Sequence, residues 1–587
     1  MSVSQSESGN ALPHHMRVRA LLFMFKLAAI AALVAIANSG FFERILLLIV
    51  QDRFITLAGF LGVWGLSLVA ILVAAFQPNL WLRIVWAAVI AVTTAVGFSF
   101  RLASGTDFTL LDAVSLWSAR HEAARALAFY SGDFQAFLLV LACGFVALAL
   151  PPRAIGGRLQ RLIAALAWVP ALPVAVIAAI IVVQEGGGAQ ALPIQFAPLS
   201  VGAVAGWKVA TVAVPERKGV VWTPGQFEVR KIVLIVDESV RGDFIDWTSS
   251  NPFTPELASL KSHIVDFGPA ASGGNCSHYS NALLRFAAAR NEVGPKLLTN
   301  PTIWQYAKKA GFRTVFVDAQ AAFNRNPGKL QNFMTAKEAS DIDGFYALDA
   351  KTPTDALDDR LLDVVMKELR LQQPVLIYAV KNGAHFPYDR GYPATEAQFH
   401  PTMTQAVGDD AKFRINSYRN VVRWSVDRFF KRLFEEADLS DSVIIYTSDH
   451  GQSFNPQRLT HCTIENPDPR EALVPLFVIP AADAMRVRFE AAAKSSQGRS
   501  SHFSIAPTIL ELLGYRRRDV ASIYQESLLG PALAKPAFTT GDIFGLFSSH
   551  VRWHPIDLSE AYRDPVPGPG LNLSRRAGDD EGPRIPR

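Results

Sequence analysis

The chain has 587 residues, of which 50% are hydrophobic and 19% are charged. This length exceeds that of one typical domain, and such an apolar composition is unusual for a wholly soluble protein. The net charge of +5 is spread along the chain, which gives no case for binding nucleic acid. Three cysteines are too few for a disulfide framework in a chain of this length.

The first third of the chain holds five apolar stretches that are long enough to span a bilayer. They cover residues 19–38, 55–76, 79–99, 135–151 and 160–183. Together they predict a five-span membrane domain over 19–183. Basic residues precede the first stretch and crowd the loop before the fifth, so the positive-inside rule places residues 1–18 in the cytoplasm. The C-terminal two-thirds would then lie in the periplasm, if the membrane is a bacterial inner membrane.

Between and after these stretches the pattern changes. Residues 101–134 carry apolar side chains at helical spacing, which predicts amphipathic helices at the outer surface of the membrane. Gly/Pro-rich sequence marks 184–225 as a linker. We expect a soluble domain over 226–535 and a C-terminal extension over 536–587 that is disordered from about 565.

The soluble part alternates between apolar runs and helical patterns. The runs that read as strands are 231–239, 312–320, 374–382, 442–450 and 472–480. Apolar strands separated by helices predict an α/β domain with a largely parallel sheet that helices cover on both faces. Such sheets carry their chemistry at the carboxyl ends of the strands.

Carboxylates and imidazoles follow several of these strands, where a parallel sheet would gather them at one edge. In chain order they are Asp237, Glu238, His385, Asp449, His450 and His461. An Asp-His-Gly sequence after a strand is also an ordinary capped turn, so the prediction depends on the convergence of the whole set. Together these side chains suit a divalent metal such as Zn²⁺ or Mn²⁺.

The stretch SGGNCSHYSNALLRF, residues 272–286, joins a glycine pair to a small polar run and then to a helical pattern. A nucleophile is often presented in this way, and Cys276, Ser277 and Ser280 are the candidates. The same residues also form an ordinary turn into a helix, so the stretch alone does not choose among these readings.

Seven motifs follow one another along the soluble part. They read VDESVRGD, GGNCSHYSN, AHFPYDRGYP, YTSDHGQS, LTHC, REALVPLFV and SHFSIAPTILELLGY. With five spans before them, they resemble the membrane phosphoethanolamine transferases of the alkaline phosphatase/sulfatase superfamily, which modify lipid A and related envelope glycans. The resemblance covers about 230–515, and the membrane region matches only in plan.

The resemblance implies an alkaline phosphatase/sulfatase-like domain and a role for each strand-end residue. Glu238, Asp449 and His450 would bind the principal metal together with the nucleophile, with Zn²⁺ favoured and Mn²⁺ the alternative. The substrate-facing residues would be His385, His461 and Asp237. In this sequence Gln452 stands where the transferases commonly carry a glutamate.

The nucleophile departs from the family pattern, because the transferases use a threonine. In an ungapped comparison with a sulfatase-type CSPSRAALL, Cys276 falls on the nucleophile, but the proline and arginine that direct formylglycine formation are missing. Near a helix N-terminus and a dication its thiolate would be favoured. We therefore prefer Cys276 as nucleophile and metal ligand, with Ser277 as the alternative. A Cys276–Cys462 disulfide is a further possibility that would block a thiol mechanism.

The resemblance implies metal-dependent transfer of phosphoethanolamine from phosphatidylethanolamine to lipid A or another envelope glycan through a covalent phospho-enzyme. A phosphoglycerol transferase and a sulfatase-like hydrolase are the enzymatic alternatives. The remaining alternative is an inactive relative that binds or senses lipopolysaccharide.

Overall fold

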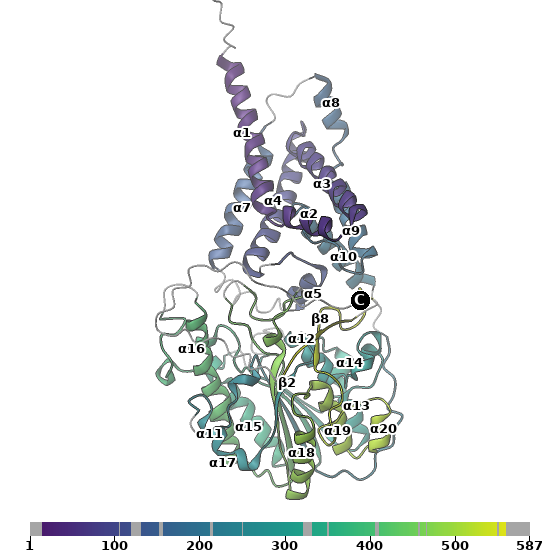
Figure 1. Cartoon of the computed structure of the whole chain (residues 1–587), viewed down its shortest axis with the longest axis vertical. Coiled ribbons are helices and arrows are strands. Elements are labelled where there is room, and N and C mark those ends of the chain that lie inside the picture. The colour runs from purple at the N-terminus through teal and green to yellow at the C-terminus, as the bar shows by residue number, and fades with distance from the viewer. Residues whose placement is uncertain are drawn as a thin grey trace, which may run out of the picture.

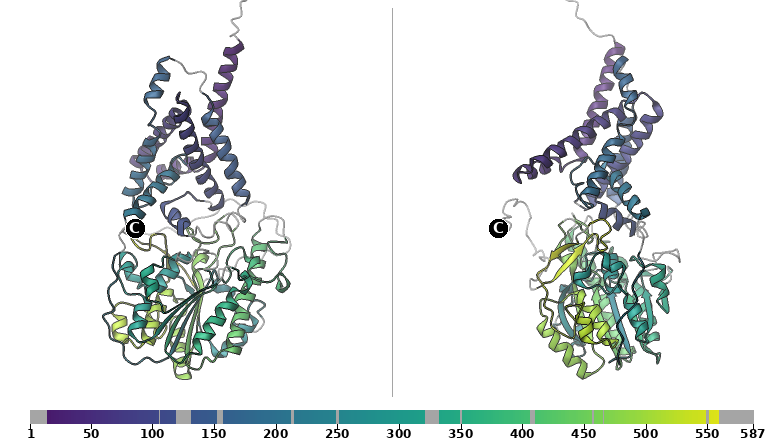
Figure 2. Two further views of the ribbon diagram at one scale, coloured as in Figure 1. Left: turned by 180° about the vertical axis from the view of Figure 1, so that it is seen from behind. Right: turned by 90° about the vertical axis from the view of Figure 1, so that its right-hand side faces the viewer.

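Helices form the N-terminal third of the molecule, and an α/β domain adjoins one end of them (Figures 1 and 2). The computed structural model describes residues 14–104, 106–118, 131–151, 157–211, 215–248, 251–320, 332–348, 351–405, 410–455, 458–464, 466–548 and 551–558. Of the predicted cytoplasmic segment 1–18, residues 1–13 lie outside the described residues. The segment from about 565 that we predicted to be disordered also lies outside them.

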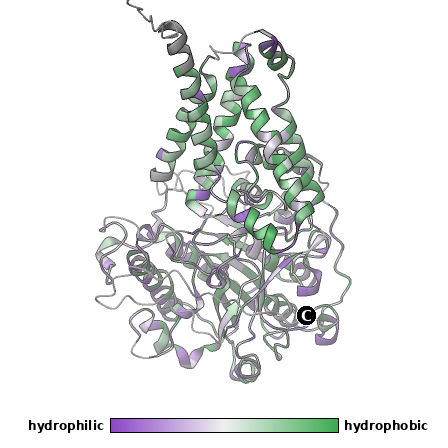
Figure 3. Cartoon of the chain, turned by 45° about the horizontal axis from the view of Figure 1, so that its top comes forward, coloured by the Kyte–Doolittle hydropathy of each residue, from purple (hydrophilic) through white to green (hydrophobic). Residues whose placement is uncertain are grey.

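The helical part contains nine labelled helices among the described residues. They are α1 (His14–Ala37), α2 (Phe41–Val50), α3 (Phe54–Ala75), α4 (Leu80–Ser104), α5 (Leu110–Ser118), α7 (Ser131–Ala149), α8 (Gly157–Ala165), α9 (Ala171–Val183) and α10 (Ala197–Thr211). Apolar residues run along most of their length (Figure 3). Of the predicted amphipathic segment 101–134, the structure describes the end of α4, α5 and the start of α7, whereas 119–130 lie outside the described residues.

The number of membrane spans stays a prediction. Within the described ranges, α3 and α4 are long and apolar enough to cross a membrane, and α1 with α2 forms a pair bent by 55° that would make a third span. α7 and α9 contribute shorter apolar segments. The predicted fifth stretch is broken into α8 and α9. By the length and apolar composition of the described helices, two or three could span a membrane, whereas the sequence predicted five spans.

The predicted linker 184–225 is wrong for the residues that form α10. Val201 and Val204 of this helix are buried in the same apolar cluster as side chains of α3 and α9. Pro198 lies in the first turn, where its missing N–H costs no helical hydrogen bond. The Gly/Pro content that suggested a linker is thus compatible with a helix that packs against the membrane helices.

The α/β domain is built on a seven-stranded sheet with the order β2-β7-β6-β1-β5-β3-β4. The strands are β1 (Lys231–Asp237), β2 (Val265–Ala271), β3 (Arg313–Asp318), β4 (Gly344–Ala347), β5 (Val375–Val380), β6 (Ser442–Ser448) and β7 (Leu473–Ile479). Among them only β7 runs against its neighbours, so the predicted, largely parallel sheet is confirmed. β2 was not predicted, because Gly268 and Pro269 interrupt its apolar pattern.

Helices cover both faces of this sheet, because successive side chains of a strand point to opposite faces. Along β1, Ile232 and Leu234 belong to one apolar cluster, whereas Val233 and Ile235 belong to the other. The helices of the first cluster are α13 (Ile303–Lys309), α18 (Asp483–Ser495), α19 (Ile505–Leu512) and α20 (Arg517–Ala521). Those of the second are α15 (Leu357–Leu369), α16 (Ala411–Val422) and α17 (Arg428–Glu436).

The C-terminal extension is part of the fold as far as residue 558. It forms a hairpin of β8 (Ala537–Thr540) and β9 (Arg552–Pro555). The Thr539 amide and hydroxyl both donate to the Gly273 carbonyl, at 2.9 and 2.8 Å. The extension therefore holds the loop that precedes α12 (Ser277–Arg285).

Candidate active site

Three of the polar residues predicted at the strand ends meet at one edge of the sheet. The helix α12 begins at this edge and lies at the end of the α/β domain nearest α5 (Figure 1). Glu238 follows β1, and Asp449 and His450 follow β6, the strand paired with β1 in parallel. All three side chains are buried, and one ligand atom from each lies within 4.8 Å of the other two. We call these three residues the acidic trio. The structure thus brings together three of the four predicted metal ligands, without Cys276.

The acidic trio has the donor set and geometry of a cation site. His450 Nε2 lies 3.4 Å from Glu238 Oε1 and 3.8 Å from Asp449 Oδ1. Asp449 Oδ1 accepts hydrogen bonds from the backbone amides of Ser239 and His450, at 3.1 and 2.8 Å. Asp449 Oδ2 is buried and has no hydrogen-bond partner among the described residues. A buried carboxylate oxygen without a partner is costly unless a cation occupies the space before it.

The backbone fixes which nitrogen of His450 is available. Its Nδ1 lies 2.7 Å from the Gly451 carbonyl oxygen, which can only accept a hydrogen bond. Nδ1 therefore carries a proton, and in the neutral ring Nε2 presents a lone pair to the acidic trio. A backbone carbonyl that orients the imidazole in this way is typical of metal-binding histidines.

The charges inside the acidic trio favour positive charge at its centre. Burial and the neighbouring Glu238 raise the pKa of Asp449 well above its usual value. Burial acts to lower the pKa of His450, but the charges of Asp449 and Glu238 outweigh it and raise that pKa to about 9. Burial acts to raise the pKa of Glu238, but the contact with His450 and the charges of His450 and His385 outweigh it and lower that pKa.

Of the three candidate nucleophiles Cys276, Ser277 and Ser280, it is Ser277 whose side chain contacts the acidic trio. It is the first residue of α12, and its Oγ lies 3.2 Å from Glu238 Oε2 and 3.1 Å from His450 Nε2. Ser280, the other serine of this run, is buried and donates to the Gly274 carbonyl at 2.7 Å. Its hydroxyl holds the turn, whereas that of Ser277 is half-buried and lies at the site.

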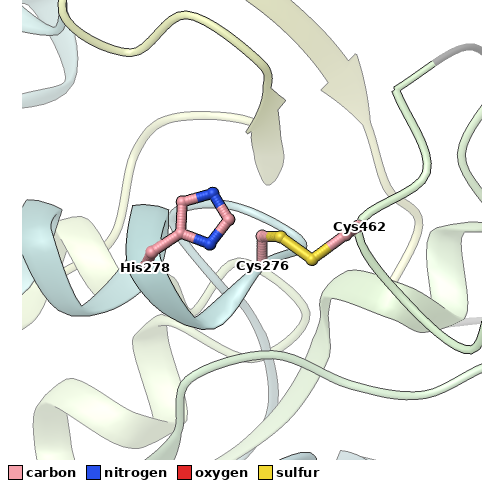
Figure 4. Close-up of side chains that lie close together, drawn as sticks. All are labelled: Cys276, His278 and Cys462. Atoms are coloured by element: carbon pink, nitrogen blue, oxygen red, sulfur yellow. A yellow bond between two sulfur atoms is a disulfide. The ribbon is translucent and has the colours of Figure 1, made fainter. Parts of the chain in front are cut away.

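Cys276 forms a disulfide with Cys462, with their Cα atoms 4.7 Å apart (Figure 4). With its sulfur in this bond Cys276 has no thiol to attack phosphorus or to bind a metal, so our preference for it over Ser277 is corrected. The disulfide was the remaining possibility for this pair. Sequence could not decide among them, because Cys462 lies 186 residues away along the chain and only the fold sets their separation. His278 lies beside the disulfide, and we call Cys276, Cys462 and His278 the sulfur trio.

The two predicted substrate histidines lie next to the acidic trio, and both are half-buried. The His461 ring stacks on that of His450, with centroids 4.2 Å apart and planes inclined by 22°. Its Nδ1 lies 3.2 Å from Gln452 Oε1. His385 Nδ1 donates to the Phe386 carbonyl at 2.6 Å, which leaves Nε2 as its accepting nitrogen when neutral.

Asp237 is not placed to contact a substrate, which corrects the role that we expected for it. It is fully buried and forms an ion pair with Lys381, and the Tyr446 hydroxyl donates to it at 2.8 Å. The alternation along β1 explains the difference, because Asp237 shares the face of Val233 and Ile235. Asp237 supports the strand end from beneath the site.

Two polar residues that hold Glu238 were missed. Gln320 Nε2 donates to Glu238 Oε2 at 2.7 Å, and the Ser239 hydroxyl donates to Glu238 Oε1, also at 2.7 Å. Gln320 comes just after β3, so the rule that parallel strands gather chemistry at their carboxyl ends could have found it.

His502 was also missed as a support of the loop before Ser277. Burial lowers the pKa of His502 to about 3, so the ring is neutral. Its Nδ1 accepts from the Gly273 amide at 3.1 Å, and its Nε2 therefore donates to Thr447 Oγ1 at 2.9 Å. The ring thus ties the loop to the end of β6.

Residues 230–515 match the model of the family described as Sulfatase. This range contains the sheet, the acidic trio and Ser277. The α/β part of the chain is therefore a sulfatase-family domain.

Curated relatives and solved structures narrow the comparison. The Kdo(2)-lipid A phosphoethanolamine 7''-transferase of Salmonella typhimurium is 26% identical over 274 residues, 45% of this chain and 46% of that protein. The Putative transferase YhbX of Escherichia coli K12 is 28% identical over 232 residues, 38% of each chain. The matched region thus spans less than half the length of these relatives.

The integral membrane protein lipooligosaccharide phosphoethanolamine transferase A (EptA) from Neisseria meningitidis superposes with a TM-score of 0.58 at 17% identity, covering 85% of this chain and 98% of that one. This likeness shows a shared fold that extends into the helical N-terminal part.

Proposed function

We propose that this protein transfers phosphoethanolamine from a membrane phospholipid to lipid A or another envelope glycan, with Ser277 as the nucleophile. The observation that carries the proposal is the Ser277 hydroxyl within 3.2 Å of both Glu238 and His450, beside a buried Asp449 oxygen that has no partner among the described residues. The named activity of the Salmonella relative supports the choice of transferred group and acceptor.

The residues present fit a divalent metal. Glu238, Asp449, His450 and Ser277 would hold it, and a mixed nitrogen and oxygen donor set suits Zn²⁺, with Mn²⁺ as the alternative. When bound, the ion would lower the pKa of the Ser277 hydroxyl and offset negative charge on the phosphoryl oxygens.

The chain's own residues then account for two successive displacements. In the first, Ser277 loses its proton and its Oγ bonds to phosphorus, while the bond from phosphorus to the diacylglycerol oxygen breaks and that oxygen is protonated. In the second, an acceptor oxygen loses its proton and bonds to phosphorus, and Ser277 leaves and regains a proton. A covalent phospho-enzyme thus divides one transfer into two easier steps.

We propose that His385 and His461 carry the protons that the leaving lipid oxygen gains and the acceptor oxygen loses. Both lie beside the acidic trio without belonging to it, and a half-buried imidazole can hold or release a proton near neutral pH. The Nδ1 hydrogen bond of His385 to Phe386 leaves Nε2 as its exchanging nitrogen.

The position of the site supports a lipid donor. Ser277 is the first residue of α12, which lies at the end of the α/β domain nearest the helical part (Figure 1), whose helices are largely apolar (Figure 3). A cavity of about 630 Å³ is lined by Tyr279 of α12, by Leu111 of α5 and by residues 541–544, together with charged side chains that include Arg217 and Lys337. Apolar side chains beside a membrane part suit a lipid-derived substrate.

The disulfide supports the proposed location. Disulfides persist in oxidising compartments such as the bacterial periplasm and are rare in the cytosol. A Cys276–Cys462 bond at the site therefore fits an α/β domain on the periplasmic side of a multi-pass inner-membrane protein.

The test uses the purified full-length protein with Zn²⁺ or Mn²⁺, phosphatidylethanolamine labelled in its acyl chain, and lipid A as acceptor. We expect labelled diacylglycerol together with a lipid A product that has gained phosphoethanolamine, seen by mass spectrometry. Diacylglycerol from phosphatidylglycerol alone would indicate phosphoglycerol transfer, and diacylglycerol without an acceptor product would indicate hydrolysis. No product from either lipid, with metal bound, would contradict the proposal and favour an inactive lipid-binding relative.

A further inference from the structure

The disulfide joins the two loops that carry reacting groups of the proposed site. Cys276 directly precedes Ser277, and Cys462 directly follows His461. In Figure 4 the bond leads from the start of α12 to the loop that carries Cys462. A single covalent link therefore lies one residue from the candidate nucleophile on one side and one residue from a candidate proton carrier on the other.

Hydrogen bonds between these loops join Asn275, which precedes Cys276, to Cys462 and Thr463. The Cys462 amide donates to the Asn275 carbonyl at 2.8 Å, and the Asn275 side chain donates to the Thr463 carbonyl at the same distance. Glu471 accepts from the side chains of Asn275 and Thr463, at 2.7 Å each. These bonds anchor the backbone after His461. The His461 ring is itself held by stacking on His450 and by its contact with Gln452, and the disulfide adds the covalent link between this loop and the start of α12.

The local conformation of Cys462 also needs support. Its φ of +65° places it in the left-handed region, which a non-glycine residue occupies only where the surrounding structure holds it there. Cys462 thus forms the backbone turn that directly follows His461, whose ring stacks on that of His450.

We propose that Cys276 and Cys462 are positioning residues, whose disulfide fixes His461 in reach of Ser277 during phosphoryl transfer. This inference rests on the proposed function. Small displacements of a reacting group are expensive in rate, because the alignment of the reacting atoms accounts for much of the acceleration. In this proposal the disulfide acts through His461 and forms no bond to the transferred group.

The link can be opened chemically. A dithiol reductant supplies two electrons, the S–S bond breaks, each cysteine sulfur becomes a thiol, and the reductant closes to its own cyclic disulfide. The freed sulfurs and His278 would then offer a soft donor set for Zn²⁺, so the reduced protein is compared at a fixed free metal concentration. Cys143, the remaining cysteine, is exposed in α7, and a Cys143→Ser background removes it from the chemistry.

The experiment is a double-mutant cycle in full-length protein. Its arms are Cys276→Ser/Cys462→Ser, His461→Ala and the combination, with kcat and KM measured for release of labelled diacylglycerol. We expect the paired serine variant to lose about 10-fold in kcat with KM little changed. We also expect the combined variant to be no slower than His461→Ala alone, because the disulfide has nothing left to position.

Reduction of the wild-type disulfide should reproduce the loss, reoxidation should restore kcat, and the paired serine variant should not respond. Losses that multiply in the combined variant would show a general structural role and overturn the proposal. An unchanged kcat in the paired serine variant would overturn it as well.

A second measurement separates this inference from the proposed function. Hydrogen exchange of residues 458–464 is followed in oxidised and reduced protein, with α15 as an internal control. If the oxidised protein turns over no donor lipid, the proposed function fails, and faster exchange of 458–464 on reduction would still support the disulfide as the element that holds this loop. Unchanged exchange would overturn the positioning role whatever the activity.

Discussion

Two groups of three donor side chains lie next to Ser277, and in each group the donor atoms are within 4.8 Å of one another. The acidic trio leaves a buried carboxylate oxygen without a partner among the described residues, whereas two of the three donors of the sulfur trio are joined by a covalent bond. Residue types alone would favour the sulfur trio as a zinc site. The comparison teaches that a metal site depends on which donors remain unsatisfied after folding.

The two groups also differ in what they contribute to folding. Two buried carboxylates beside each other destabilise the folded chain unless a cation lies between them. A disulfide that closes a long loop stabilises it, mainly by restricting the unfolded state. Within the acidic trio, Asp449 with its raised pKa therefore costs folding free energy in the metal-free protein, whereas the disulfide of the sulfur trio stabilises the loops around it.

The largest expected effect separates Ser277 from Cys276. Ser277→Ala removes the candidate nucleophile, and we expect turnover of phosphatidylethanolamine to fall by about 10³-fold or more. Ser277→Thr keeps the hydroxyl at the N-terminus of α12 and should retain measurable turnover. Release of labelled diacylglycerol measures both. Near-normal turnover in Ser277→Ala would remove Ser277 from the mechanism and reopen the assignment of the sulfur trio.

The second effect tests which trio holds the metal. Asp449→Asn keeps the Oδ1 hydrogen bonds to the amides of Ser239 and His450 but removes a charge, and we expect Zn²⁺ binding to weaken by about 100-fold. Competition with a chromophoric chelator measures this affinity. The matched control is Cys276→Ser/Cys462→Ser, which should bind Zn²⁺ as the wild type does. Loss of binding in the control instead would reverse the comparison.

The third effect concerns the support of the acidic trio. Gln320→Leu removes the amide that donates to Glu238 Oε2, and we expect Zn²⁺ affinity to fall by about 10-fold. Gln373 lies exposed just before β5, and Gln373→Leu is the matched control that should change nothing. The same chelator competition applies. Equal affinities in the two variants would show that Glu238 needs no such orientation.

Much of the sheet and the gathering of polar residues at its edge could be predicted from local patterns, and the resemblance to the phosphoethanolamine transferases then singled out the acidic trio among those residues. Buried parallel strands are continuous apolar runs, and parallel pairing brings their carboxyl ends to one edge. Glu238 and Asp449 therefore had to meet once β1 and β6 were neighbours. β2 and α10 could not be predicted in this way, because Gly and Pro residues interrupt their apolar patterns. Tertiary packing nevertheless stabilises them as a strand and a helix.

The errors at the site have one physical origin, which is that sequence does not give the direction or the partner of a side chain. Asp237 and Glu238 are adjacent, yet one points to Lys381 beneath the sheet edge and the other to Ser277. Cys276 and Ser277 are adjacent as well, and Cys462 removes the first from the chemistry. A one-residue difference decides each role.

The smallest expected effect is on stability and has the opposite sign in the two trios. Burial and Glu238 raise the pKa of Asp449, so its ionised form destabilises the metal-free protein as pH rises through that raised pKa, and the cost is absent below its ordinary pKa. In metal-free protein at pH 8, Asp449→Asn should increase the free energy of unfolding by about 1 kcal/mol, or about 2–4 °C in Tm. The paired serine variant should melt lower than the wild type. Thermal melts in chelator measure both, and the Asp449→Asn gain should shrink at pH 4, where the wild-type carboxyl is protonated. A gain that persisted at pH 4 would mean that repulsion between the carboxylates is not what destabilises the empty site.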